Sequence, residues 1–284
     1  MFDDWPFKDQ FNRPACAAFG VVAAVEWRHH TPANAQNPHA VFPRYGEQHL
    51  YWDARVREGV FPIPPDEGAH LKLVAEASTL VGIAHDHLWP YAADPAPAHH
   101  CPATHAGLPH LTGATPPATG VRADAAARLC PMTWVDLSGP RRAERVLDAL
   151  RLYGPLALSL PVAGRDKRDP EAEASEYVWT NPQTRTDGII ADPPAGWEPV
   201  GAGHTVCVVA ALPDPRDRAR AGRPARPARP VFVFRNSWPN WGTHPNGLPR
   251  GYGRVRWSFV DKYARSMAHW SDPAVGHARA KGVD

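Results

Sequence analysis

The chain changes character near its middle, and this change restricts the folds open to it. In the first half, residues 15–27 have the spacing of a helix with a buried face, and further helical segments cover about 47–58 and 68–80. In the second half, short β-branched or aromatic runs alternate with turn-rich segments, which predicts an antiparallel sheet or small barrel. Helices first and strands later indicate an α+β fold with two lobes. The predicted strands are 156–162, 206–212, 231–234 and 252–257.

The length of 284 residues suits one large domain or two lobes packed around one site. We interpret 1–284 as a single domain, with a helical lobe at about 8–91 and a mainly β lobe at about 134–262. A site between two such lobes would occupy a common position for a substrate cleft. The remaining predicted segments are a long loop or insertion at 92–133, a helix at 141–153, insertions at 163–200 and 213–230, and a C-terminal tail at 263–284.

The charge balance gives no reason to expect a polyanionic partner. The net charge is +2, and the excess arginine lies mostly in 216–229, a stretch of Arg, Pro and Ala. We interpret this stretch as a solvated insertion, and a nucleic-acid or membrane patch is the alternative. No run approaches the roughly 18 apolar residues that a membrane span needs. We therefore predict neither a nucleic-acid nor a membrane partner.

The cysteines favour a reducing compartment. If Cys16 is a free nucleophile, three cysteines remain, and an odd number argues against a full disulfide framework. Cys207 alternates along an apolar strand and is predicted to be buried, whereas Cys101 and Cys130 could pair across the loop that they bracket. The N-terminus has no basic segment followed by an apolar one, so no secretory signal is recognised. We expect a cytoplasmic protein, with secretion left open if an upstream segment was removed.

Three residues far apart in the sequence have the chemistry of one acyl-transfer site. Cys16 opens a helical run, His204 opens an apolar strand, and Asn236 follows another apolar run. The helix N-terminus and a neighbouring imidazolium would favour the thiolate of Cys16. His204 would accept the thiol proton and deliver it to the leaving amine. These residues predict a Cys-His-Asn hydrolase that needs no cofactor and no metal.

Two further side chains fit supporting roles in this site. Asn236 would bond the second ring nitrogen of His204, and Trp238 would shield that bond from water. Gln10 stands six residues before Cys16, so its amide can reach the position where the backbone N–H of Cys16 meets a developing oxyanion.

The ordered set of motifs resembles the papain-like cysteine peptidases, and it runs from about residue 8 to residue 262. Several intervening blocks are similar to those of bacterial members, namely Leu50-Tyr51-Trp52, Gly82-Ile83-Ala84, Trp89-Pro90-Tyr91 and Tyr153-Gly154-Pro155-Leu156. The main signatures are Gln10 followed by Cys16, Gly203-His204-Thr205-Val206, Arg235-Asn236-Ser237-Trp238 with Trp241-Gly242, and Gly251-Tyr252-Gly253-Arg254-Val255.

The resemblance implies a helical left lobe and a β-barrel-like right lobe with the cleft between them. It makes Cys16 the nucleophile, His204 the acid/base, Asn236 the orienting residue and Gln10 the oxyanion donor. The implied substrate-binding residues are Gly68, by a loose alignment to the family's loop glycine, together with Gly203 and Trp238.

The chain also departs from the family pattern. Ala17 follows the nucleophile where tryptophan is usual, and Arg13, Pro14 and Ala15 precede it where glycine and a disulfide cysteine are usual. The step from Trp238 to Trp241 is one residue shorter than the common form, with Pro239 in place of glycine. The intervals from Cys16 to His204 (204 − 16 = 188) and from His204 to Asn236 (236 − 204 = 32) are long, consistent with insertions.

Other clusters have simpler interpretations. Zinc needs three or four converging ligands, and the histidine groups lack regular spacing, so we interpret them as solvated or packing residues. Trp179 and Trp197 lie in inserted segments, where core packing and an exposed binding platform are the alternatives. The histidine groups are His29-His30, His85 with His87, and His99-His100 with Cys101 and His105.

Three functions follow from the sequence. The first is a cysteine peptidase that hydrolyses peptide or protein substrates through an acyl-enzyme on Cys16. The second is a transpeptidase or peptide-tailoring enzyme, suggested by the altered residues beside Cys16 and Trp238. The third is a non-catalytic peptide-binding module on the same fold. Substrate preference, endo- or exopeptidase action, oligomeric state and control by a partner or fused domain stay open.

Overall fold

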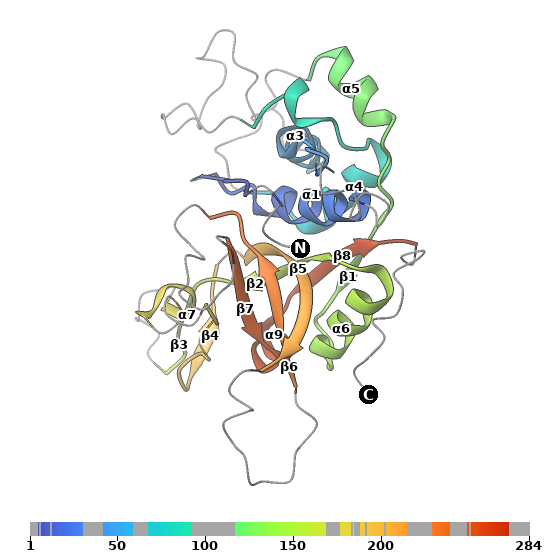
Figure 1. The fold of residues 1–284 in the computed structure, drawn as a ribbon. Coiled ribbons are helices and arrows are strands. Elements are labelled where there is room, and N and C mark those ends of the chain that lie inside the picture. The colour runs from blue at the N-terminus through green and yellow to red at the C-terminus, as the bar shows by residue number, and fades with distance from the viewer. Residues whose placement is uncertain are drawn as a thin grey trace.

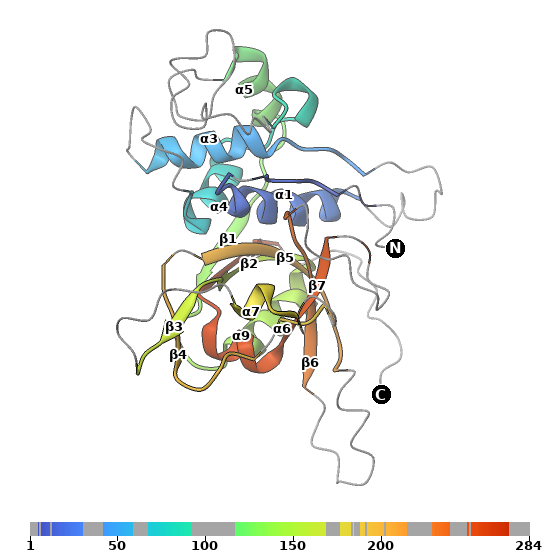
Figure 2. The same ribbon diagram turned by 90° about the vertical axis from the view of Figure 1, so that its left-hand side faces the viewer.

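In the computed structural model the chain is an α+β protein with two lobes (Figures 1 and 2). The structure describes residues 5, 7–11, 13–30, 42–58, 68–91, 117–168, 177–182, 184, 188–190, 192–201, 203–214, 229–238, 249 and 251–272.

The helical lobe is built around α1 (Cys16–His29), whose residues from Ala17 to Glu26 are all buried. A helix that is apolar on nearly every side is stable only when other elements surround it. Helices α3 (Glu47–Arg57) and α4 (Leu71–Leu80) pack against it. The 3-10 helix η1 (Asp86–Leu88) and α5 (Thr119–Ala126) complete the lobe.

The other lobe contains a six-stranded sheet in the order β1-β8-β2-β5-β6-β7, with antiparallel neighbours throughout. In the described residues this sheet has two free ends, β1 and β7, and no ladder closes it into a barrel. Its strands are β1 (Met132–Asp136), β2 (Leu156–Pro161), β5 (Gly203–Pro213), β6 (Pro230–Arg235), β7 (Tyr252–Arg256) and β8 (Ser266–Trp270).

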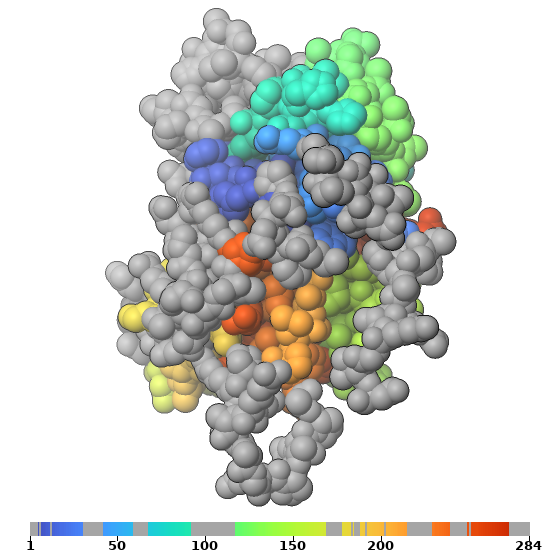
Figure 3. Space-filling view, in the orientation of Figure 1, coloured from blue at the N-terminus to red at the C-terminus, as the bar shows by residue number. Residues whose placement is uncertain are grey.

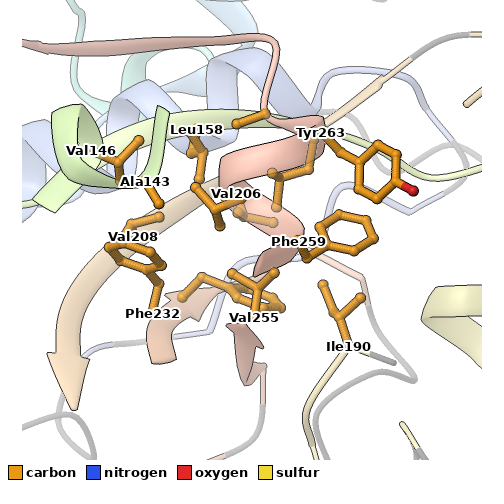
Figure 4. Close-up of a cluster of buried hydrophobic side chains, with 14 of the residues drawn as sticks. Ala143, Val146, Leu158, Ile190, Val206, Val208, Phe232, Val255, Phe259 and Tyr263 are labelled. Atoms are coloured by element: carbon orange, nitrogen blue, oxygen red, sulfur yellow. The ribbon is translucent and has the colours of Figure 1, made fainter. Parts of the chain in front are cut away.

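The sheet is a middle layer between helices. Helix α1 packs on β2 and β5 from the helical lobe, and α6 (Arg142–Tyr153) with α9 (Trp257–Tyr263) covers the opposite side. Figure 4 shows the core on that side, where side chains of α6, α9 and four strands meet. The space-filling view shows the helical segments above the orange C-terminal strands (Figure 3). A two-stranded antiparallel sheet of β3 (Gly164–Asp166) and β4 (Trp197–Pro199) lies beside the larger sheet, with the short α7 (Tyr177–Thr180) between these strands in the chain.

Most predicted elements are confirmed, and two segments are corrected. The predicted helices correspond to α1, α3, α4 and α6, and the predicted strands to β2, β5, β6 and β7. The predicted C-terminal tail at 263–284 is wrong over Ser266–Trp270, because this segment is β8, an inner strand paired with β1 and β2. The interpretation of 92–133 as a loop is wrong over Thr119–Ala126, which is helix α5, and at Met132, where β1 begins. Residues 92–116 lie outside the described part.

None of the helices in the described part of the chain is long and apolar enough to cross a membrane. Cys130 and Cys207 are buried free thiols, as predicted for Cys207, so Cys130 forms no disulfide. Cys101 lies outside the described residues. No group of three or more His, Cys, Asp or Glu side chains in the described part could hold a metal ion.

Candidate active site

Close packing of α1 on β5 brings the separated candidate residues into one region. A Cβ atom on Gly20 would stand 2.7 Å from Thr205 Cγ2, so only glycine allows this approach without displacing Thr205. Cys16 lies at the start of α1, and His204 lies beside Thr205 on β5. Asn236 follows β6, the neighbour of β5, and is buried like His204.

His204 and Asn236 form the hydrogen bond that the sequence led us to expect. His204 Nε2 lies 2.7 Å from Asn236 Oδ1, which also accepts the backbone N–H of Ser237 at 2.8 Å. Because Oδ1 is an acceptor, Nε2 must carry the proton of the neutral imidazole. Nδ1 is therefore the nitrogen left with a lone pair for a thiol proton.

Two indoles pack against the imidazole and against each other. Trp238 stacks on His204 with ring centroids 4.1 Å apart, and Trp179 meets it edge to face at 5.5 Å. Trp179 is fully buried and donates its Nε1–H to Pro161 O at 2.9 Å. Trp197 is buried against Tyr263. The alternative that Trp179 and Trp197 form exposed platforms is therefore wrong, and Trp179 adds an active-site contact that the sequence did not single out.

The thiol of Cys16 lies among hydrogen-bond donors at the start of α1. Ala15, the N-cap residue, provides no side-chain acceptor, so it does not occupy the first amides of the helix. The backbone amides of Cys16, Ala17 and Thr205 and the hydroxyl of Thr205 all favour the thiolate, so they act to lower the pKa of the thiol. The thiol therefore lies near Thr205, the residue that follows His204.

Burial dominates the protonation of both candidate catalytic groups. It raises the pKa of the Cys16 thiol above 9.0, although the hydrogen bonds from Thr205 and the helix amides oppose it. It also lowers the pKa of His204 to about 4, and the bond to Asn236 only partly offsets this. Both shifts favour a thiol with a neutral imidazole, in contrast to the thiolate and imidazolium expected from the sequence.

Gln10 is fixed at both ends of its side chain. Nε2 donates to Arg13 O at 2.9 Å, and Oε1 accepts the hydroxyl of Ser237 at 2.5 Å. These bonds define which end of the amide is nitrogen and leave one N–H of Nε2 for another acceptor. The backbone N–H of Gln10 also donates to Ser237 O at 2.9 Å. Gln10 is therefore tied directly to the residue after Asn236.

The predicted substrate-binding glycines lie near these residues. Gly68 has φ +94, which suits glycine, and a Cβ there would stand 3.3 Å from Pro14 O, two residues before Cys16. Gly203 begins β5 next to His204. Trp241 and Pro239 lie outside the described residues, so their predicted effect on the leaving-group side stays a prediction.

A buried charge network beside the site was not predicted. Lys8 Nζ lies 2.6 Å from Glu26 Oε1 and 2.8 Å from Glu47 Oε1, and Arg235 Nη1 lies 3.9 Å from Glu26 Oε2. Burial lowers the pKa of Lys8, but Glu47 and Glu26 outweigh it and raise the pKa above 10.5. Glu26 within an apolar helix and Arg235 within an apolar strand were the available signals, because buried charges are usually paired.

Comparisons with known proteins identify the fold. No protein-family model and no curated protein sequence matches the chain. Xylellain, a cysteine protease from Xylella fastidiosa, superposes with a TM-score of 0.62 at 18% identity, covering 94% of this chain and 82% of that one. The bromelain protease from Ananas comosus, in complex with the E64 inhibitor, gives 0.54 at 14% identity, covering 95% and 94%. Digestive procathepsin L 3 of Tenebrio molitor superposes with a TM-score of 0.55 at 17% sequence identity, and the match covers 96% of this chain and 67% of that one.

These neighbours are all papain-like cysteine proteases, and the match spans almost the whole chain. The chain therefore has the papain-like two-lobed fold, as the resemblance of its motifs implied. At 14–18% identity the likeness establishes the fold, so the chemistry has to be argued from this chain's own residues.

Proposed function

We propose that the protein is a cysteine peptidase that cleaves peptide bonds through an acyl-enzyme on Cys16. The observation that carries the proposal is the buried 2.7 Å bond from His204 Nε2 to Asn236 Oδ1, stacked against Trp238. It leaves Nδ1 as the free base of an imidazole whose neighbour on β5, Thr205, contacts the thiol. The papain-like fold of the cysteine proteases that the chain resembles supports the same assignment.

In the proposed reaction, the thiol of Cys16 lies within hydrogen-bond reach of His204 Nδ1 when the substrate is bound. Sγ attacks the scissile carbonyl carbon as its proton passes to His204 Nδ1, and the carbonyl oxygen becomes an oxyanion. The backbone N–H of Cys16 and the remaining N–H of Gln10 Nε2 would donate to that oxygen.

Collapse of this intermediate breaks the C–N bond, and His204 gives its proton to the leaving amine. A water molecule then attacks the thioester, with His204 as base, and the proton returns to sulfur as the acid is released. Asn236 keeps the ring oriented through both half-reactions, because its bond to Nε2 does not involve the nitrogen that moves the proton.

Active-site labelling tests the proposal. An epoxide inhibitor such as E64, with which the bromelain structure was solved, is expected to label the reduced protein once, at Cys16. Cys16→Ala should abolish both labelling and cleavage of a peptide library followed by mass spectrometry. Cys130 and Cys207 should not react, because both thiols are buried out of reach of the reagent, whereas Cys16 is partly exposed. A folded, reduced sample that takes up no label would refute the assignment.

The same digestion separates hydrolysis from acyl transfer. With a saturating amine acceptor, a peptidase gives free carboxylic acids, whereas a transpeptidase gives the new amide. Turnover of any peptide that depends on Cys16 also excludes a purely binding module.

A further inference from the structure

The segment that leads into Cys16 is held in an uncommon backbone conformation. Phe11 has φ +51, a value that favours glycine and is an outlier for a bulky residue. Phe11 is 42% exposed and so gains little from burial. Such a conformation persists only where the surroundings impose it, and it is often found at functional sites. Because Gln10 is the residue before Phe11, the contacts that impose this conformation also help to set the position of Gln10.

Gln10, which precedes Phe11, is held by hydrogen bonds at its backbone carbonyl and at its side-chain amide. Its carbonyl accepts Tyr91 Oη–H at 3.0 Å and the N–H of Arg13 at 3.2 Å. Its side-chain Nε2 donates to Arg13 O at 2.9 Å. Arg13 therefore touches Gln10 through both its N–H and its carbonyl, and its placement sets the position of the Gln10 amide.

The guanidinium of Arg13 fixes that placement. Arg13 is 5% exposed, and its Cζ lies 4.5 Å from the centroid of the Tyr91 ring. Nη1 also donates to Gln48 Oε1 on α3 at 3.3 Å. Tyr91 in turn meets Phe19 of α1 edge to face at 4.8 Å. One side chain thus ties the Gln10 segment to α3 and, through Tyr91, to the helix that begins with Cys16.

We infer that Arg13 is a positioning residue for the oxyanion site: with Tyr91, it holds the Gln10 amide where the tetrahedral intermediate needs a donor. The inference rests on the proposed function. Arg13 and Tyr91 take part in no bond-making step, and they act through Gln10 alone. A misplacement of about 1 Å can cost on the order of 10²-fold in rate. Loss of the contacts that Arg13 and Tyr91 make with Gln10 should therefore lower kcat.

The test compares two reactions of the same thiol. Cleavage of a peptide amide forms an oxyanion, whereas alkylation of Cys16 by iodoacetamide displaces iodide and forms none. Arg13→Met is expected to lower kcat by about 100-fold and Tyr91→Phe, which removes one hydroxyl, by about tenfold. Both should alkylate within about twofold of the unmodified chain. The control is Arg28→Met at the far end of α1. It removes a contact between a guanidinium and an aromatic ring, that of Trp270, and should change neither kcat nor the alkylation rate.

A double-mutant comparison separates positioning from general damage. If Arg13 acts through Gln10, Gln10→Ala combined with Arg13→Met should be no slower than Gln10→Ala alone. Additive losses in kcat, or alkylation that slows in parallel with kcat in Tyr91→Phe, would overturn the inference. Unchanged kcat in Arg13→Met and Tyr91→Phe would overturn it while leaving the peptidase assignment intact. An unmodified chain that neither cleaves peptides nor alkylates at Cys16 would overturn both.

Discussion

At the scale of single residues, the surroundings of His204 decide how the site holds its protons. Asn236 fixes the ring, and His204 is buried, with Trp179 and Trp238 packed against its imidazole. An imidazole without nearby water or a carboxylate loses stabilisation when it is charged, which is why its pKa falls to about 4. His204 is therefore a neutral base, and the resting thiol keeps its own proton.

This protonation state predicts the pH dependence of thiol alkylation. The rate follows the thiolate fraction, and burial raises the pKa of Cys16 above 9.0. His204 is already neutral above about pH 4, so it offers no positive charge to sustain a thiolate between pH 5 and 8. The iodoacetamide rate is therefore expected to climb about tenfold per pH unit from pH 6 to 8, measured by mass spectrometry of the peptide that contains Cys16.

Cys16→Ala gives the background for that measurement. A rate that is already level at pH 5 would show a thiolate-imidazolium pair in the resting state and would contradict the neutral pair.

At the scale of elements, the sequence predicted the helices and strands that are set by short-range patterns along the chain. Helices α1, α3 and α6 and strands β5 and β6 follow from the spacing of apolar residues and from Pro and Gly at their ends. Strand β8 was missed because all five of its residues are buried, so no alternation marks it. Helix α5 was missed because only Val121 and Ala125 are buried in it.

The candidate site was predictable as a set of residue types, but its contacts were not. The sequence identified Cys16, His204 and Asn236 by their positions next to elements, and the bond between His204 and Asn236 has the expected form. The contact between the thiol and Thr205 depends on how α1 crosses β5, which is a tertiary property. The network around Lys8 joins Lys8 to Glu47, 39 positions away, and Glu26 to Arg235, 235 − 26 = 209 positions away, so it is beyond the reach of any local pattern.

The crossing of α1 and β5 gives an element-scale prediction. Gly20→Ala would place a methyl group 2.7 Å from Thr205 Cγ2 in a packed interface, so α1 or Thr205 must shift. We expect a loss of about 1–3 kcal/mol in the free energy of unfolding, measured by urea denaturation, with lower activity because Cys16 and His204 move apart. Gly120→Ala on α5 is the control, since its Cβ meets nothing within 4 Å and alanine favours a helix. Equal stability of both variants would contradict the tight crossing.

At the scale of the whole molecule, one network of buried charges joins segments of both lobes. Lys8 comes from the N-terminal segment, Glu26 from α1, Glu47 from α3 and Arg235 from β6. Two carboxylates share Lys8, and burial raises the pKa of Glu47 to about 7 despite the lysine. Arg235 directly precedes Asn236, so the network supports the strand end that carries the orienting residue.

Removing the shared cation should therefore destabilise both lobes together. Lys8→Met leaves Glu26 and Glu47 facing each other without their ammonium partner, and we expect a loss of about 3–5 kcal/mol in the free energy of unfolding. Lys72→Met is the matched control, because Lys72 is exposed and 3.8 Å from Glu76, a pair worth less than about 1 kcal/mol. Urea denaturation followed by tryptophan fluorescence measures both. Because α1 still packs on β2 and β5, Lys8→Met should unfold in one transition. An early, separate unfolding of the helical lobe in this variant would contradict that expectation and would show that the lobes depend on the Lys8 network for their coupling.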